Sequence, residues 1–264
     1  MAYNTIDYIP IATPSDATDF GDLTMSRSYL AACSNGTRGV FGGGDPWQTK
    51  NVIDYITIAS PSNATDFGDL TGGRYGLGAC SDGTKGVWGG GETNTNTIDY
   101  VTIASPSNAT DFGDLTVVRT TAACSDGTKG LFGGGYSSGR ENTIDYVTIA
   151  SPSNATDFGD LTVERSDLAA CSDGTKGVWA GGSGNTNTID YVTIATPSGA
   201  TDFGDLPVGR YGLAACSDGT KGVWAGGSGN TNTIDYVTIA SPSNATDFGD
   251  LTVGRYGLAA CSGD

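Results

Sequence analysis

The chain of 264 residues has no histidine, and its 13 lysine and arginine residues stand against 29 aspartate and glutamate residues, giving a net charge of −16. Binding to nucleic acid or to an anionic membrane surface needs a basic footprint, so this charge argues against both partners. No apolar run approaches the ~18 residues of a membrane span, which argues against membrane insertion. The start, MAYNTIDYIP, lacks the basic and apolar parts of a secretory signal, so we expect no Sec export.

The missing histidine and the cysteine spacing argue against a metal site or a cofactor. The six cysteines include no CxxC pair, and they recur every 44 to 47 residues at Cys33, Cys80, Cys124, Cys171, Cys216 and Cys261. Each occupies the same place in a repeat, so no disulfide is expected, because that bond needs Cα atoms within ~7 Å. The recurrent DFGD carboxylates flank a predicted strand without a compact calcium loop. We expect buried thiols, a solvated acidic face, no metal and no cofactor.

What the sequence does contain is one segment copied along its whole length. Residues 187–227 read NTIDYVTIATPSGATDFGDLPVGRYGLAACSDGTKGVWAGG, and near-copies fill the rest. The 42 glycines fall at fixed places in the copies, so this is not a low-complexity chain. A period of this length with strand-like content predicts a propeller or a solenoid, and a closed array of repeats is one cooperative body. We therefore expect a single domain over residues 1–264.

Each copy contains four predicted strands, whose positions we name A, B, C and D. In the copy that begins at Arg210 they cover residues 211–216, 222–225, 233–239 and 246–251. Position C is rich in β-branched and aromatic residues, and Gly, Ser, Asn and Pro separate the strands. No stretch has helical periodicity. Four short antiparallel strands per repeat are typical of a propeller blade, so the predicted fold is an all-β propeller.

The order of landmarks in each copy resembles the kelch repeat. It runs from Arg through a small apolar strand, an Asp-Gly or Asn-Gly turn, GV(W/F)xGG, (T/V)IDY(V/I), a TPS or SPS turn and DFGDL. The resemblance covers the whole chain, with one departure, a phenylalanine where kelch usually has tryptophan. That residue is Phe20, Phe67, Phe112, Phe158, Phe203 or Phe248.

The copies are more alike than those of typical kelch proteins. Phrases such as NATDFGDLTV and GTRGVFGGG resemble the kelch-like repeat proteins of tailed bacteriophages, particularly phages of marine bacteria. This second resemblance implies a virion location and a tail or fibre role. Without it, the missing secretory signal predicts a cytoplasmic protein.

Counting predicted strands gives six at A, five at B, six at C and six at D. We expect six blades of four strands, with a closing blade built from both chain ends and lacking strand B. Its strand C covers residues 5–11 and its strand A residues 256–261. A five-bladed ring with spare terminal strands is the alternative. An open slot leaves unpaired edges, so a partner strand or another copy of the chain could fill it, or the blade could keep three strands.

The copies differ mainly in their B–C loops and D–A joints, which up-and-down connectivity places on one face of the disc. Only two basic residues lie outside the repeat pattern, Lys50 and Arg140, both in the longest B–C loops. These loops also carry Trp47, Tyr136 and Glu141. We expect a binding surface there, with Trp47 and Tyr136 as aromatic anchors for a sugar face or a protein. The alternative is sequence drift in unconstrained loops.

Six arginines recur in the D–A joints, at Arg27, Arg74, Arg119, Arg165, Arg210 and Arg255. If they point to the axis they form a ring that binds anions such as carboxylates. An aspartate precedes each arginine by five residues, as Asp205 precedes Arg210. The alternative is therefore a structural pair within each repeat, or bonds to loop carbonyls.

No enzyme is predicted. Galactose oxidase, a relative of kelch proteins, needs histidine ligands for copper, and catalysis needs residues that break the repeat. The expected function is a structural or binding propeller of a virion, with virion components or a host-surface receptor as partner. Two alternatives are a lectin-like module with equivalent sites between blades, and an intracellular protein-interaction platform with one site on the variable face.

Overall fold

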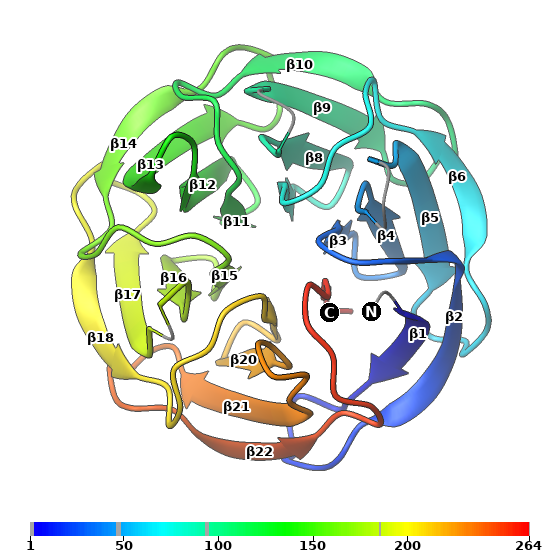
Figure 1. Cartoon of the computed structure of the whole chain (residues 1–264). Helices are drawn as coiled ribbons and strands as arrows, with labels where there is room; N and C mark the ends of the chain where they lie inside the picture. Colours follow the sequence, from blue (N-terminus) through cyan, green and yellow to red (C-terminus); the bar gives the residue numbers. More distant parts are fainter. Residues whose placement is uncertain (1–2, 46–48, 93–94, 185, 264) are drawn as a thin grey trace.

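The structure is a computed structural model that describes residues 3–45, 49–92, 95–184 and 186–263. Five antiparallel four-stranded sheets stand around a central axis as blades 1 to 5, with position A innermost (Figure 1). Blades 1 and 2 are β3 (Ala31–Ser34), β4 (Arg38–Gly42), β5 (Val52–Thr57), β6 (Thr65–Asp69), and β7 (Gly78–Ser81), β8 (Lys85–Gly89), β9 (Thr97–Thr102), β10 (Thr110–Asp114). Blades 3 and 4 are β11 (Ala122–Ser125), β12 (Lys129–Tyr136), β13 (Arg140–Thr148), β14 (Thr156–Asp160), and β15 (Ala169–Ser172), β16 (Lys176–Ala180), β17 (Thr188–Thr193), β18 (Thr201–Asp205). Blade 5 is β19 (Ala214–Ser217), β20 (Lys221–Ala225), β21 (Thr233–Thr238) and β22 (Thr246–Asp250).

The predicted all-β propeller is confirmed, and its blades have the predicted strands. No described residue lies in a helix, so no described helix is long and apolar enough to cross a bilayer. Strand A begins later than predicted, at Ala214 instead of residue 211 in blade 5. The residues before it form a turn around the axis, in which Gly212 has a φ of 67°. A positive φ does not fit an extended strand, and this explains the difference.

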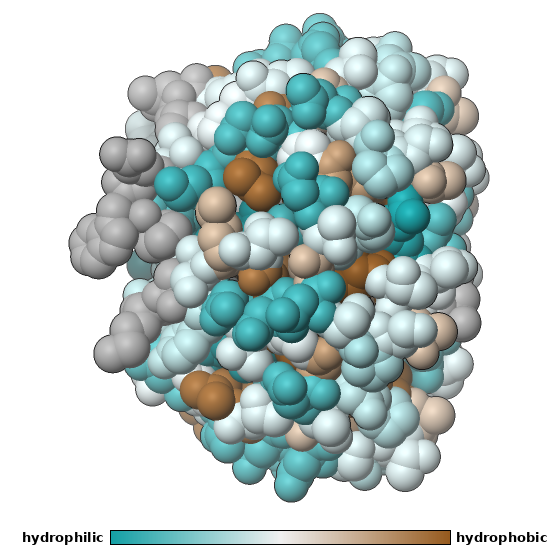
Figure 2. Space-filling view, turned by 90° about the vertical axis from the view of Figure 1, so that its right-hand side faces the viewer, coloured by the Kyte–Doolittle hydropathy of each residue, from teal (hydrophilic) through white to brown (hydrophobic). Residues whose placement is uncertain are grey.

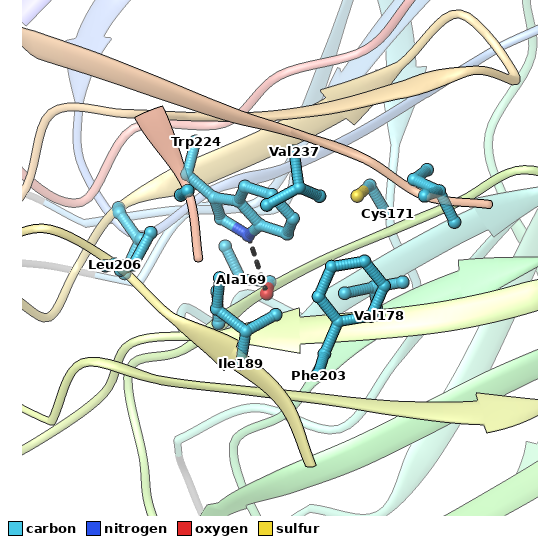
Figure 3. Packing of buried hydrophobic residues seen from close by; sticks show 12 residues of the cluster. Ala169, Cys171, Val178, Ile189, Phe203, Leu206, Trp224 and Val237 are labelled. Carbon is cyan, nitrogen blue, oxygen red and sulfur yellow. Dashed lines mark hydrogen bonds between the residues drawn. The ribbon is translucent and has the colours of Figure 1, made fainter. Parts of the chain in front are cut away.

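The hydrophobic core lies between neighbouring blades. In Figure 3, Trp224 of β20 packs on Ala169, Ile189 and Leu206 of blade 4. Its indole N–H donates to the Ala169 carbonyl at 3.3 Å, and Trp88 and Trp179 make the same bond to the blade before them. All three indoles are fully buried, each worth roughly 2–3 kcal/mol of transfer free energy. These interfaces therefore hold the blades together.

A glycine in strand B makes this close packing possible. In each complete blade this glycine lies over the cysteine of the blade before it, as Gly222 lies over Cys171. A Cβ at Gly222 would come within 2.7 Å of that sulfur, so a larger residue does not fit. The repeated Cys and the repeated Gly of KGVW thus form one interlocking contact.

A second inter-blade contact runs around the outer rim. The glycine of each DFGD segment sits at an irregularity of strand D, as Gly113 does with φ 145°. There the Asp114 carbonyl accepts from the N–H of Ala155 in the next blade, and the Asp114 N–H donates to the Asn154 side chain. Equivalent backbone bonds join all six sectors of the ring. The uniform C–D turns are therefore explained by this contact.

A third contact is a series of backbone hydrogen bonds around the axis, 2.5 to 3.0 Å long. In each of these bonds the N–H of the first residue donates to the carbonyl of the second: Tyr29 to Gly257, Gly76 to Tyr29, Thr121 to Gly76, Gly212 to Asp167, and Gly257 to Gly212. Each participant lies two residues after one of the six arginines. The segment near the C-terminus thus takes part in the axial series as a sixth member.

Between blades 5 and 1 lies the closing sector, which consists of the two-stranded sheet β1 (Tyr3–Tyr8) and β2 (Thr18–Arg27) and of residues 256–263 (Figure 1). The described residues thus form five complete blades, as in the five-bladed alternative, and not a sixth four-stranded one. The predicted strand at residues 256–261 is wrong, since this segment has no strand structure. In the five blades strand A pairs with strand B, and no described strand lies between this segment and β1.

The segment 256–263 nevertheless follows the path of a strand A. The Ser34 hydroxyl donates to the Ser262 carbonyl, as the Ser125 hydroxyl donates to Ser81 between blades 3 and 2. A Cβ at Gly39 of blade 1 would lie 2.8 Å from the Cys261 sulfur, which is the Cys–Gly contact seen between complete blades. Both chain ends therefore contribute to one sector, as predicted.

Figure 2 shows the outer rim on the side of blade 1. Hydrophilic residues dominate this view, and apolar residues form small separate patches. The aspartate that begins the DFGD segment of β6, Asp66, is exposed, as is Thr65 before it. This agrees with the predicted solvated acidic face.

Candidate functional site

The six arginines of the D–A joints are buried in ion pairs inside the ring. Their partners are the aspartates of the IDY segments at position C, at N–O distances of 2.6 to 3.0 Å. The pairs are Arg27–Asp54, Arg74–Asp99, Arg119–Asp145, Arg165–Asp190, Arg210–Asp235 and Arg255–Asp7. The predicted partner five residues earlier is wrong, because that aspartate lies at the outer rim.

These arginines also hold the backbone in place. Arg27 donates to the carbonyls of Gly43, Val52 and Phe41, and Arg119 to those of Gly134 and Phe132. Burial lowers the pKa of Arg27, while Asp54 opposes that shift. In the five complete blades the guanidinium thus joins a D–A joint to strands B and C, whereas Arg255 bonds to Asp7 and to the Val253 carbonyl. The geometry fits a structural pair better than an open anion-binding ring.

B–C loops and D–A joints share one face of the disc, as predicted. In blade 2 the Glu92 N–H donates to the Tyr75 carbonyl, and in blade 5 the Ser228 N–H donates to Tyr211. The first residue of each pair lies in the B–C loop and the second in the D–A joint. The described parts of these variable segments therefore lie on the same face of the disc, which we call the variable face.

The loop of blade 3 forms a hairpin at the edge of this face. Tyr136, the last residue of β12, pairs with Arg140, the first residue of β13, and 47% of Tyr136 is exposed. Arg140 is exposed and its guanidinium lies against Gly184 in the loop of blade 4. The Glu141 carboxylate accepts a bond from the Ser137 hydroxyl. Tyr136 and Arg140 are thus accessible, while Glu141 supports the hairpin.

The loop of blade 1 carries the other predicted residues. Trp47 lies outside the described residues. The Lys50 N–H donates to Gly44, and the Lys50 carbonyl accepts from Arg74 of the next D–A joint. Blade 2 stands between blades 1 and 3, so Lys50 and Tyr136 belong to separate parts of the variable face. Whether these residues bind a ligand stays a prediction.

Around the axis, the variable face carries a group of tyrosines that the sequence reasoning missed. The ring of Tyr29 lies 6.3 Å from that of Tyr75 and 5.9 Å from that of Tyr256. Tyr211 and Asp167 interact electrostatically with Tyr29 as well. We call these five residues the axial tyrosine cluster. It draws on five of the six D–A joints and exists only because the ring closes.

Two members of this cluster hold strained backbone conformations. Tyr29 and Asp167 both have a φ of 56°, a region that is costly for residues with a side chain. The equivalent residues in three other copies are glycines, Gly76, Gly212 and Gly257, with φ of 66° to 68°. This backbone conformation favours glycine, yet Tyr29 and Asp167 adopt it with a phenol and a carboxylate side chain. Strain of this kind gathers at binding and active sites.

The cluster is partly removed from water, which alters its titration. Burial and the Asp167 carboxylate raise the pKa of Tyr29 to about 12. Burial also raises the pKa of Asp167, against the effect of a hydrogen bond from Ser166. Burial, Glu92 and Asp45 raise the pKa of Tyr75. The phenols of Tyr29 and Tyr75 are therefore uncharged at neutral pH.

Behind the cluster a small axial pocket of about 70 Å³ opens. Tyr29, Asp167 and Thr120 contribute to its wall, together with the glycines of the axial series. This volume accepts a few water molecules or the tip of one side chain, and not a sugar ring. Tyr29 and Asp167 are the two cluster members that line this pocket, beside five leucines. With the tyrosines next to Tyr29, they suit the tip of a cationic side chain.

One sequence signal could have revealed the cluster. The residues after each arginine read SY, YG, TT, SD, YG and YG, so tyrosine is frequent there and aspartate is unique. The sequence alone did not show that these six places converge, because they lie 44 to 47 residues apart.

Among the described residues, no three His, Cys, Asp or Glu side chains are grouped so that they could hold a metal ion. All six cysteines are free thiols. No protein-family model matches the chain, and no curated protein matches it in sequence. The propeller fold with repeated four-stranded blades thus rests on the structure itself, while the likeness to kelch and phage proteins stays a resemblance.

Proposed function

We propose that this protein is a non-enzymatic binding propeller that holds a partner protein at the axial tyrosine cluster through a basic side chain. The observation that carries this proposal is the convergence of Tyr75, Tyr211, Tyr256 and Asp167 around Tyr29. A lysine or arginine tip over a tyrosine face gains cation–π attraction, and a nearby carboxylate adds to it. The net charge of −16 favours approach of such a partner.

The position of the cluster favours one site for each molecule. Its members come from D–A joints that differ in sequence, and they meet only at the axis. A lectin-like module with equivalent sites between blades is less well supported, because the inter-blade space is filled by buried Trp and Phe side chains. A single site on the variable face is what an interaction platform needs.

Catalysis is not part of the proposal. The chain has no histidine, and the six recurrent arginines are engaged in ion pairs. A Tyr29 phenol with a pKa of about 12 keeps its proton at neutral pH, so it is a poor nucleophile there.

A role in a virion, as a tail or fibre protein for attachment or assembly, is a further part of the proposal. It is supported only by the resemblance of the repeat phrases to phage proteins. Co-purification of the protein with virus particles, or a gene position among tail genes, would test it. Absence from purified particles would instead favour an intracellular platform.

The binding proposal is tested with two glycine variants, Tyr29→Gly and Asp167→Gly. Each installs the residue that three other copies have at this place, so the backbone keeps its φ and we expect a melting temperature close to that of the wild type. The probe is a fluorescent lysine-rich peptide, followed by anisotropy at low salt. Wild type should bind it, and each variant should bind at least tenfold more weakly.

The same lysine-rich peptide with acetylated side chains is the control for charge. It should bind at least tenfold more weakly than the unmodified peptide, because acetylation removes the cation. Equal binding of both peptides, or full binding by Tyr29→Gly and Asp167→Gly, would contradict the proposed site. Saturation at five or six equivalent sites in a glycan titration would favour the lectin-like alternative.

A further inference from the structure

The closing sector contains an apolar cleft of about 420 Å³, far larger than the axial pocket. Its outer wall is β1 and its inner wall is the segment 256–263. Blade 5 and blade 1 form its two sides, with Val223 and Ile234 on one and Phe41 and Ile56 on the other. In every complete blade the space between positions A and C is occupied by strand B. The cleft therefore has the position of a strand B.

Residues around the cleft are more exposed than their counterparts in complete blades. Ile103, Ile149, Ile194 and Ile239 have no exposed surface at the end of position C, whereas Ile11 and Ile58 are only half-buried. Ile6 is also only half-buried, whereas its counterparts in the five complete blades have no exposed surface. These counterparts are Ile53, Ile98, Ile144, Ile189 and Ile234. Cys216 and Cys261 are half-buried, while the other four cysteines are buried. The difference affects those side chains that a strand B would cover.

We propose that this cleft binds an extended segment of a partner protein, which adds to β1 as the strand B of the closing sector. The five strands B define the five successive residues of that segment. They are a basic residue, a glycine, a valine or leucine, an aromatic residue and a small residue, as in Lys-Gly-Val-Trp-Ala. Strand addition of this kind gains backbone hydrogen bonds along an open sheet edge and specificity from alternate side chains.

The backbone of β1 and the residues after it is compatible with an added strand. In blade 4 the Ile194 N–H donates to Thr175, and the Gly181 N–H donates to the Thr188 carbonyl. Alternate residues of position C thus turn toward strand B, and their counterparts here are Thr5, Asp7, Ile9 and Ile11. Pro10 falls between them, so its missing N–H removes no bond to the incoming strand.

The side walls match the two alternating faces of such a segment. By equivalence with Trp224, its aromatic ring would lie on Ala214, Ile234 and Leu251, with an indole N–H directed to the Ala214 carbonyl. Its valine would face Phe20 of β2 and Phe41 of blade 1. The cleft thus provides an apolar place for each of the two large side chains.

Two further contacts specify the glycine and the basic residue. The glycine would lie over Cys216, as Gly222 lies over Cys171. In blades 2 to 5 the lysine of strand B donates to carbonyls at the end of position C in the next sector, as Lys85 does to Ala150 and Lys221 to Ala12. For the incoming segment these carbonyls are those of Ile58 and Ala59. A lysine there would also lie near Tyr8, which is 46% exposed.

A second copy of the chain is a weaker candidate for the occupant. The five strands B of one molecule are each paired on both edges within their own blades. To donate one, a molecule would have to open a complete blade. A strand that is not already part of a complete blade does not have this cost.

The test uses a synthetic peptide, SDGTKGVWAGG, which is the sequence of residues 217–227. Added to the full chain, it should bind one to one in calorimetry and raise the melting temperature in proportion to its concentration. A peptide with valine in place of the glycine before Val-Trp should bind at least tenfold more weakly, because its side chain would collide with Cys216. Equal binding of the two peptides, or no binding of the first, would overturn the proposal.

Two protein variants give a matched control. Cys216→Leu fills the place of the peptide glycine, so the folded variant should bind the peptide at least tenfold more weakly while it keeps its melting temperature within a few degrees. Cys171→Leu makes the same change where Gly222 already lies, and it should lower the melting temperature strongly. If both changes lower the melting temperature equally, the space beside Cys216 is already filled and the cleft is closed. If the chain forms concentration-dependent dimers that exclude the peptide, the occupant of the cleft is a second copy.

Discussion

Among single residues, the repeated cysteine shows how packing against the next blade changes the titration of a side chain. Cys80 is buried, touches Gly130 of the next blade, and has no disulfide partner. Burial, with a smaller effect of Asp82, raises its pKa to about 12 from the ordinary 9.0. The folded protein therefore holds this thiol protonated at a pH where an unfolded chain loses the proton.

This shift predicts a loss of stability in alkali. Because the folded pKa of Cys80 is raised, its contribution to the free energy of unfolding is complete below about pH 9 and declines as the pH rises toward 12. The slope is about 1.4 kcal/mol per pH unit for one such thiol. Chemical denaturation across this range should show a shallower decline for Cys80→Ala than for the wild type. Identical slopes for both proteins would show that the thiol ionises as freely in the fold as out of it.

The residue scale is also where sequence reasoning failed. An aspartate at a constant distance from each arginine suggested a local pair, yet Arg210 binds Asp235, which lies on strand C of the same blade. Both aspartates recur in every copy, so spacing alone does not choose between them. Burial decides it, because Asp235 faces an inter-blade space and Asp205 contacts the next blade at the rim through its backbone.

At the scale of the element, strands were predictable and their ends were less so. Alternating β-branched residues and glycine-rich turns located strands B, C and D to within one or two residues in blade 5. Strand A was predicted three residues too early, because the axial turn looks like a strand in sequence. The irregularity at each DFGD glycine was also missed, since its cause is a contact with the next blade.

That contact leads to a prediction for Gly113. Its φ is 145°, and a Cβ would come within 2.5 Å of the Ser153 carbonyl oxygen of the next blade. Gly113→Ala should therefore lower the free energy of unfolding by about 3 kcal/mol or more, through strain and the forced separation of two blades. Thermal and denaturant unfolding would measure this loss.

Gly127→Ala is the matched control. Gly127 also has a positive φ, 81°, but nothing lies within 4 Å of its Cβ position. Only the backbone strain remains, so we expect a loss of about 1–2 kcal/mol. If the two substitutions cost the same, the rim contact is not what requires glycine at the DFGD position.

At the scale of the whole molecule, three sets of contacts close the ring around an incomplete sector. Ala17 donates to Asp250 at the rim, Arg255 pairs with Asp7, and Gly257 joins the axial series. The number of repeats and the meeting of both chain ends in one sector were predictable from the sequence. The conformation of the chain ends was not predictable. The segment 256–263 would form a strand only beside a pairing partner, and the local sequence does not show whether that partner is present.

Among the described residues, the closing sector has strands at positions C and D, a strand-like path at position A, and nothing at position B. The most direct measurement is the melting temperature of a chain in which residues 262–264 are replaced by SDGTKGVWAGG, so that the strand is supplied within the molecule. Burial of its tryptophan and valine should add roughly 3 kcal/mol, which raises the melting temperature by about 5–10 °C and abolishes binding of the free peptide. An unchanged melting temperature, with free peptide bound as by the original chain, would show that the closing sector has no place for a strand B.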